Sequence, residues 1–246
     1  MPSSPAYVLS TRPLSPTLVD TAAANGVRID ILPFIAVEPL KLGAGELPAG
    51  PSTAVFTSVN ALAALENNAM TALKGGGGRA WKIFCLGGAT WQKAAEYFGR
   101  AAIAGTADSA RELADEIVRQ MPAEKASSGI DAGADRELWF FCGDRRRDEL
   151  PDLLGQAGLK VHEIFVYRTR LTPHRIGRNY DAIAFFSPSA VESFFSVNTL
   201  PPDIPLFAIG GTTAGAIRRI CRNPVTESER PDEETLIHQI IKNIQH

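Results

Sequence analysis

The sequence has few of the residues that mark metal sites, disulfide frameworks and redox centres. Its 246 residues include three cysteines and four histidines. The cysteines, Cys85, Cys142 and Cys221, are far apart and odd in number, so they predict buried, reduced thiols. The histidines lack the spacing of metal ligands, and we expect no metal site.

Long hydrophobic runs and an excess of one charge are also missing. No apolar stretch approaches the roughly 20 residues that span a bilayer, so we expect no membrane association. The net charge of -2 gives no electrostatic reason to expect a nucleic-acid partner. The first residues, MPSSPAYVLSTRP, lack the basic start and apolar core of a signal peptide, and we expect a cytoplasmic protein.

Several well-known catalytic signatures are absent. The sequence contains no G-x-S-x-G, H-E-x-x-H, C-x-x-C or G-x-G-x-x-G motif. The stretch KGGGGR at 74–79 is not followed by the Gly-Lys-Ser/Thr of a phosphate loop and is expected to be a surface loop. We therefore expect no cofactor, and chemistry that depends on binding, positioning and backbone dipoles, with one weak acid.

The sequence does contain a regular alternation of strand-like and helix-like runs, which predicts an α/β fold with parallel sheets and crossover helices. Strong helix starts are predicted at Ser15, at Ser109 with Glu112, and at Ser187 with Pro188. The predicted strands cover 6–10, 28–34, 53–57, 82–86, 138–142, 160–167, 181–186 and 205–209.

The order of these runs occurs twice. VLSTRP at 8–13 has the layout of WFFCGD at 139–144, and both lead through a helix ending near a glycine, Gly26 or Gly158, into a second strand. FTSVNAL parallels FFSPSAV, and FCLGGAT parallels FAIGGTT. The repeat of about 120 to 130 residues predicts an internal duplication into two similar α/β domains.

The loops that follow the strands are the most informative parts of the sequence, because ligands of open parallel sheets bind at the carboxyl ends of the strands. These loops combine glycines, hydroxyls and helix-start amides, which favour anions. We expect a ligand with several carboxylates or phosphates. The candidate contacts are Arg12, Ser58, Asn60, Gly88, Thr90, Gly143, Arg147, Ser187, Ser189, Gly211, Thr212 and Thr213.

Each of these signals also has a purely structural interpretation. The serines and threonines can simply cap helices. The Arg-Arg-Arg run at 145–147 can be a solvated loop, and the Gly-Gly pairs can be tight turns without a ligand. Tyr167 is the candidate acid, although a tyrosine at a strand end can also be an amphipathic residue at the edge of the core.

Taken in order, TRP, FTSVNAL, LGGAT, CGDRRRDELPDLLGQAGLKVHEIFVYRT, FFSPSAVESFF and AIGGTTAGAI resemble the uroporphyrinogen-III synthase family over nearly the whole chain. The resemblance implies a cofactor-independent lyase of tetrapyrrole biosynthesis. Such an enzyme cyclises hydroxymethylbilane to uroporphyrinogen III with loss of water and inversion of the fourth ring. We expect a monomer by default, and hand-over of the substrate from hydroxymethylbilane synthase.

The resemblance further implies that the domains are exchanged. Domain 1 would comprise residues 1–36 and 170–246, and domain 2 residues 38–167. Extended linkers at about 35–39 and 166–170 would join them. The cleft between the domains would then face both Gly-Gly turns.

The resemblance also suggests roles for individual residues. Tyr167 matches the tyrosine proposed to protonate the leaving hydroxyl, and Thr212 and Thr213 match a substrate loop. Ser58, Thr90 and Ser187 match hydroxyls that line the cleft, and Arg12 matches an arginine that would pair with carboxylates. The sequence DRRR departs from the glycine-rich loop common in the family, which leaves Arg145 and Arg146 without an assigned role.

Two other functions remain open. A non-enzymatic, two-lobed binder or sensor of an anionic small molecule could use the same loops, as could a regulatory protein derived from the same fold. A glycosyl- or phosphate-transfer enzyme would need carboxylates or a metal in the cleft, and the sequence shows no convincing set.

Overall fold

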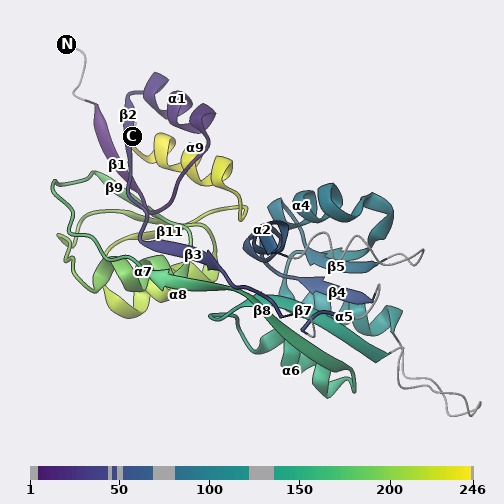
Figure 1. Ribbon diagram of the computed structural model, residues 1–246. Helices are drawn as coiled ribbons and strands as arrows, with labels where there is room; N and C mark the ends of the chain where they lie inside the picture. The colour runs from purple at the N-terminus through teal and green to yellow at the C-terminus, as the bar shows by residue number, and fades with distance from the viewer. Residues whose placement is uncertain (1–4, 44–45, 49–51, 69–80, 122–135, 245–246) are drawn as a thin grey trace, which may run out of the picture. The chain divides into compact units, whose positions relative to one another are not determined.

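The computed structural model describes residues 5–43, 46–48, 52–68, 81–121 and 136–244 (Figure 1). The chain divides into two compact units. Unit 1 consists of Met1–Ala36 and Arg170–His246, and unit 2 of Val37–Thr169. No helix in the described ranges is long and apolar enough to cross a membrane. The predicted loop at 74–79 lies outside the described residues.

Unit 1 is a parallel five-stranded sheet with helices on both faces (Figure 1). Side chains of the central strand β9 alternate between the two faces: Ala182 and Ala184 pack toward α1 and α9, and Ile183 and Phe185 toward α7 and α8. The strand order is β11-β10-β9-β1-β2, with β1 (Ala6–Ser10), β2 (Val27–Ile31), β9 (Ala182–Phe185), β10 (Leu206–Ala208) and β11 (Val225–Glu227). The helices are α1 (Pro16–Ala24), α7 (Pro188–Phe195), α8 (Gly211–Ile220) and α9 (Glu233–Ile244).

Unit 2 has the same three-layer construction. Helices α2 (Val59–Asn68) and α4 (Ala89–Phe98) cover one face of its sheet, and α5 (Ala110–Gln120) and α6 (Glu149–Gln156) cover the other. The strand order is β3-β8-β7-β4-β5-β6, with β3 (Ile35–Pro39), β4 (Thr53–Phe56), β5 (Lys82–Leu86), β6 (Ile103–Ala107), β7 (Glu137–Gly143) and β8 (Lys160–Leu171). A short 3-10 helix, Arg100–Ala102, precedes β6.

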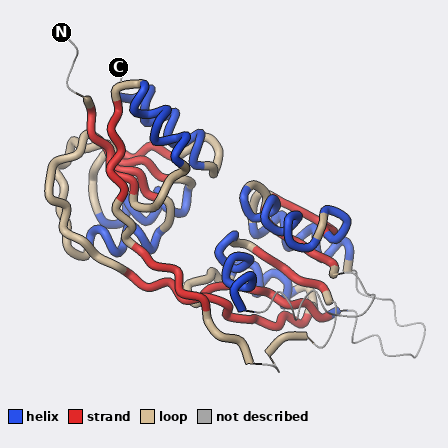
Figure 2. The backbone as a smooth tube through the Cα atoms, turned by 45° about the horizontal axis from the view of Figure 1, so that its top comes forward, coloured by secondary structure: helices blue, strands red, loops and turns tan. Residues whose placement is uncertain are grey.

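The two sheets share one topology, which confirms the predicted pair of similar α/β domains (Figure 2). The order β2-β1-β9-β10-β11 of unit 1 matches β8-β7-β4-β5-β6 of unit 2. Strand β1 therefore corresponds to β7, and β9 to β4. In each sheet the strand order reverses between these two strands, which is where open α/β sheets bind ligands.

The chain passes between the units in β3 and β8, which are neighbours in the sheet. Leu40 N donates to Val166 O over 2.9 Å, and Thr172 N donates to Phe34 O over 3.0 Å. This pairing runs antiparallel, in contrast to the rest of the sheet.

The three predicted helix starts are confirmed, since Ser15, Ser109 and Ser187 are the N-cap residues of α1, α5 and α7. Ser109 and Ser187 accept hydrogen bonds from their helix amides, whereas the Ser15 side chain makes no capping bond. Gly26 and Gly158 both have a φ of 77°, as expected after a helix end.

Two predicted strands have other bounds than expected, and two strands were missed. The strand predicted at 28–34 ends early, because β2 covers Val27–Ile31 and residues 32–34 lie between β2 and β3. Strands β6 and β11 were not predicted, because IAGTA and VTE lack a strong apolar pattern. Strand β8 continues to Leu171, so Tyr167 lies inside a strand and not at its end.

Candidate functional site

The predicted residues are divided between the carboxyl ends of the two sheets. Unit 1 carries Arg12, Ser187, Ser189, Gly211, Thr212 and Thr213. Unit 2 carries Ser58, Asn60, Gly88, Thr90, Gly143, Arg147 and Tyr167. We describe the two sets separately.

In unit 2 the structure brings Tyr167 together with Ser58, Asn60 and Gly143. The register of β7 against β8 shifts between Cys142 and Gly143, so that Gly143 pairs with Tyr167. Such an irregularity re-aims side chains. The Tyr167 ring lies directly against the Cα of Gly143, which is itself buried.

Ser58 and Asn60 come from the start of α2, directly after β4. Asn60 N donates to Ser58 Oγ over 3.2 Å, which fixes this turn. Both side chains lie near the Tyr167 phenol and act to lower its pKa. The candidate acid is therefore held by residues from strand β8, the end of β7 and the start of α2.

The environment of Tyr167 keeps its phenol protonated. Burial is the main cause that raises its pKa above the ordinary value, and the charges of Cys142 and Asp144 raise it further. Hydrogen bonds from Ser58 and Asn60 act in the opposite direction. The phenol therefore carries the proton that a general acid has to supply, and its raised pKa makes it a weak acid.

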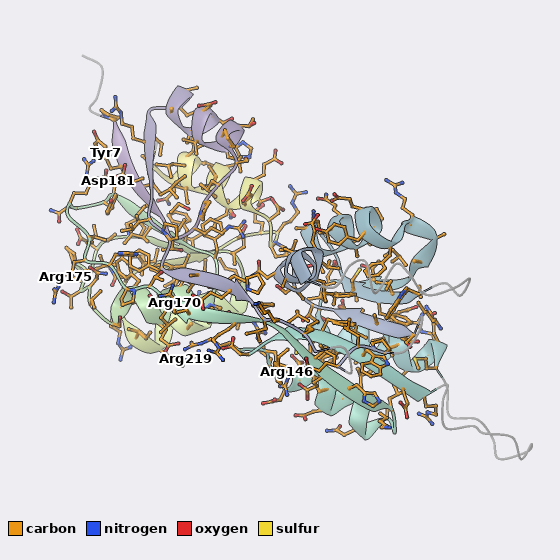
Figure 3. The ribbon with its side chains drawn as sticks, viewed as in Figure 1. Tyr7, Arg146, Arg170, Arg175, Asp181 and Arg219 are labelled. Atoms are coloured by element: carbon orange, nitrogen blue, oxygen red, sulfur yellow. The ribbon has the colours of Figure 1, made fainter. Side chains whose placement is uncertain are left out.

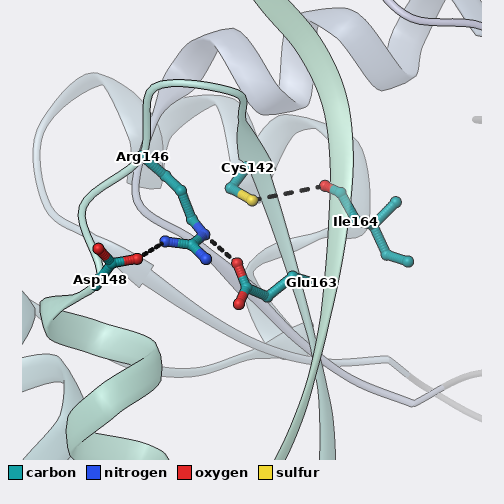
Figure 4. Close-up of polar contacts among 5 residues, drawn as sticks. All are labelled: Cys142, Arg146, Asp148, Glu163 and Ile164. Carbon is teal, nitrogen blue, oxygen red and sulfur yellow. Dashed lines mark hydrogen bonds and ion pairs between the residues drawn. The ribbon is translucent and has the colours of Figure 1, made fainter.

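The arginine-rich loop after β7 has partly structural roles. Arg146 forms ion pairs with Asp148 and Glu163 (Figure 4). Burial alone would lower the pKa of Arg146, but these two carboxylates outweigh it and raise the pKa. Arg147 is exposed and forms no ion pair with any residue in the described ranges.

The two Gly-Gly turns start α4 and α8, and neither helix has a side-chain cap. The first amides of a helix have no partner within the helix, so both starts suit an anion. Gly88, Gly211 and Thr212 are exposed. Thr90 and Thr213 are 7% and 3% exposed. These two side chains are buried and are part of the local packing.

In unit 1, Arg12 follows β1 and is held by two neighbours. Its Nη2 donates to Glu233 Oε2 over 2.7 Å, and its guanidinium carbon lies 4.4 Å from the centre of the Phe186 ring. Its Nε is buried without a hydrogen-bond partner in the described part of the chain. Ser187 caps α7 through Ala190 N at 3.1 Å, as its structural interpretation predicts. Ser189 lies in the first turn of α7 and is partly buried.

Tyr7 and Asp181 lie near each other at the amino ends of β1 and β9 (Figure 3). Tyr7 N donates to Asp181 Oδ2 over 2.7 Å, and Arg178 stacks on the Tyr7 ring at 3.3 Å. The candidate ligand contacts of unit 1 thus remain at the carboxyl ends of its strands.

Sequence reasoning missed Glu233 and Glu163, the acidic partners of Arg12 and Arg146. Glu233 is 221 residues from Arg12 in the sequence. The one sequence signal at Glu233 is its position in the acidic first turn of a helix, which does not indicate its partner. His162 contacts Glu137 at 2.8 Å and stacks on Trp139. The described residues contain no group of three or more His, Cys, Asp or Glu that could hold a metal.

Comparisons with known proteins agree with one another. The family model described as uroporphyrinogen-III synthase HemD matches residues 16–238. A uroporphyrinogen-III synthetase structure from Helicobacter pylori is 14% identical, with a TM-score of 0.67 over 97% of this chain and 99% of that one. A mutant uroporphyrinogen III synthase from Thermus thermophilus is 17% identical, with a TM-score of 0.58 over 98% and 99%. At these identities the structures show a shared fold. No curated protein matches the sequence.

Proposed function

The chain belongs to the uroporphyrinogen-III synthase family, and from this membership we propose how its own residues cyclise hydroxymethylbilane. The family reaction makes it a cyclising lyase of tetrapyrrole biosynthesis. The product is uroporphyrinogen III, with ring D inverted and one water lost. We further propose that the reaction needs no cofactor and that the protein works as a cytoplasmic monomer, with hand-over from hydroxymethylbilane synthase.

Tyr167 is the proposed general acid. Its phenol would give a proton to the hydroxymethyl oxygen while the carbon–oxygen bond breaks, so that water leaves and an azafulvene cation forms. The substituted end of ring D would attack this cation to give a spiro intermediate. Rearrangement and ring closure would follow, with loss of a proton from the pyrrole carbon. The observation that supports this role is the buried, neutral phenol between Ser58 and Asn60.

The other exposed or partly exposed candidate residues would hold the substrate. Its carboxylates suit the uncapped starts of α4 and α8 and the guanidinium groups of Arg12 and Arg147. Thr212 presents an exposed hydroxyl at the start of α8. Because these contacts are many and individually weak, we expect no single substitution among them to abolish turnover.

The test is to supply hydroxymethylbilane, oxidise the product and separate isomers I and III. Isomer III should dominate with the unmodified protein. Tyr167→Phe should lower kcat about 10²-fold, because it removes a general acid. Tyr180→Phe is the matched control, since the Tyr180 hydroxyl also has a raised pKa, of about 12, but bonds Asp30 away from the candidate site.

Two results would contradict the proposal. If the unmodified protein yields only isomer I, the product of spontaneous closure, then an anion-binding module is the better account. If Tyr167→Phe and Tyr180→Phe both retain full activity, the enzyme assignment stands but Tyr167 is not the acid.

A further inference from the structure

Gly143 lies where the backbone meets the ring of the candidate acid. A Cβ built on Gly143 would lie 2.4 Å from two ring carbons of Tyr167, Cε2 and Cζ, and 2.8 Å from its hydroxyl oxygen. Real Cβ atoms essentially never approach other heavy atoms closer than 3.0 Å. The ring can therefore occupy its position only because residue 143 has no side chain.

The backbone around this contact is fixed from both sides. Asp144 N donates to Tyr167 O over 3.2 Å, and Thr169 N donates to Asp144 Oδ1 over 2.8 Å. Strand β7 is also paired on both edges, with β4 and with β8. A clash at Gly143 would thus be relieved more easily by moving the Tyr167 ring than by moving the strand.

We propose that Gly143 is a positioning residue that seats the Tyr167 ring, so that the phenol stays between Ser58 and Asn60. Gly143 acts through Tyr167, because it is buried beneath the ring and is not open to a ligand. The catalytic consequence rests on the proposed function, whereas the seating of the ring does not.

The consequence of adding a methyl group follows from the geometry. In Gly143→Ala the ring has to move away, and its hydroxyl leaves its place beside Ser58 and Asn60. A misplacement of about 1 Å can cost about 10²-fold in rate. The displaced phenol loses the pKa-lowering effect of Ser58 and Asn60, but it also loses burial, which is the largest cause of the shift and raises the pKa, so we expect the pKa to fall.

The first measurement is NMR of protein labelled with 13C in the tyrosine rings. The chain has four tyrosines, and Tyr167→Phe assigns the signal of Tyr167. In Gly143→Ala this signal should shift at neutral pH, and its titration midpoint should fall toward the ordinary value. The other charged or titratable groups that act on this phenol, Cys142 and Asp144, are unchanged. Gly155→Ala is the matched control, because a Cβ on Gly155 meets nothing within 4 Å.

The second measurement is kinetic. Gly143→Ala should lower kcat about 10²-fold with little change in KM, and should move the alkaline limb of the kcat–pH profile to lower pH. Adding Tyr167→Phe to Gly143→Ala should cause no further loss, because both changes remove the same acid. Gly155→Ala should retain the kcat and pH profile of the unmodified protein.

Several outcomes would overturn the inference. An unchanged Tyr167 signal in Gly143→Ala shows that the ring does not depend on this glycine. A rise in KM with unchanged kcat shows that Gly143 meets the substrate directly. If the unmodified protein makes no isomer III, the proposed function fails, but the NMR comparison still decides whether Gly143 seats the ring.

A second variant covers the case in which Gly143→Ala does not fold. Asp144→Ala removes the acceptor of Thr169 N from an exposed position. It should shift the Tyr167 signal at neutral pH, whereas Asp144→Asn, which keeps an acceptor oxygen, should shift it less. Equal signals in the two variants and the unmodified protein would overturn the proposed seat.

Discussion

Replacing Glu233 with glutamine should strengthen substrate binding, because Glu233 neutralises an arginine that we propose to bind carboxylates. Arg12 Nη2 and Glu233 Oε2 lie 2.7 Å apart, and the two side chains are 43% and 31% exposed. The Phe186 ring under the guanidinium keeps Arg12 in place without the ion pair. A substrate carboxylate would either displace Glu233 or bind beside it. In both cases the negative charge of Glu233 weakens the attraction between Arg12 and the substrate carboxylate.

The size of the effect follows from the exposure of the pair. Ion pairs that are open to water contribute about 0.2–1 kcal/mol, because solvent and salt screen them. Removing this competition should lower KM by at most about fivefold, since about 1.4 kcal/mol corresponds to a factor of ten. The value of kcat should not change, and the gain should shrink as ionic strength rises.

The assay compares Glu233→Gln with Glu234→Gln at low and high salt. Both changes remove an acidic charge from the first turn of α9, so both lose the same favourable interaction with the helix dipole. Of the two, Glu233 is the one that contacts Arg12. Once Arg12→Ala is introduced, Glu233→Gln should no longer affect KM. A higher KM in Glu233→Gln would refute the argument, since it would mean that the ion pair positions Arg12 for binding.

Two further predictions concern stability and thiol reactivity. Ser109→Ala should lower the free energy of unfolding by about 1 kcal/mol, because Ser109 accepts a hydrogen bond from an amide of α5. Ser15→Ala is the control and should have little effect, since the Ser15 side chain makes no capping bond. Urea denaturation measures both variants, and equal losses of stability would contradict the prediction. Burial raises the pKa of Cys85 to about 11 and that of Cys142 to about 12, so little thiolate exists at about pH 8 and neither should react with a disulfide reagent in the native protein. The partly buried Cys221 should react first, and rapid loss of all three thiols would show that the assigned burial is wrong.

The sequence predicted the parts of the fold that depend on short-range pattern. Apolar runs such as residues 82–86 identified the central strands. A parallel strand that is covered by helices on both faces needs apolar side chains at nearly every position, so its sequence is easy to recognise. The matching Gly-Gly stretches identified the duplication, and the shared strand order confirms that the two domains are similar. Edge strand β11 was missed because its three residues bury little surface.

The arrangement of the candidate site could be predicted only in part. The loops were found because parallel strands end at one edge of a sheet. The neighbours of Tyr167, however, depend on the register of β7 against β8, where a one-residue shift changes what the ring meets. Similarly, Arg12 meets Glu233 only because β1 and the start of α9 adjoin in the folded unit. The sequence pattern predicts neither the register shift between β7 and β8 nor the packing of α9 beside β1.

The duplication also explains why residue 143 is glycine. When the two copies are aligned on Ser10 and Cys142, Thr11 takes the place of Gly143. Thr11 is fully buried and donates from Oγ1 to Ala184 O over 2.8 Å, so a side chain is accommodated after the first strand of unit 1. The fold by itself therefore does not demand glycine at this position. In unit 2 the space beside the backbone is taken by the ring of Tyr167, the residue that we propose to be the acid.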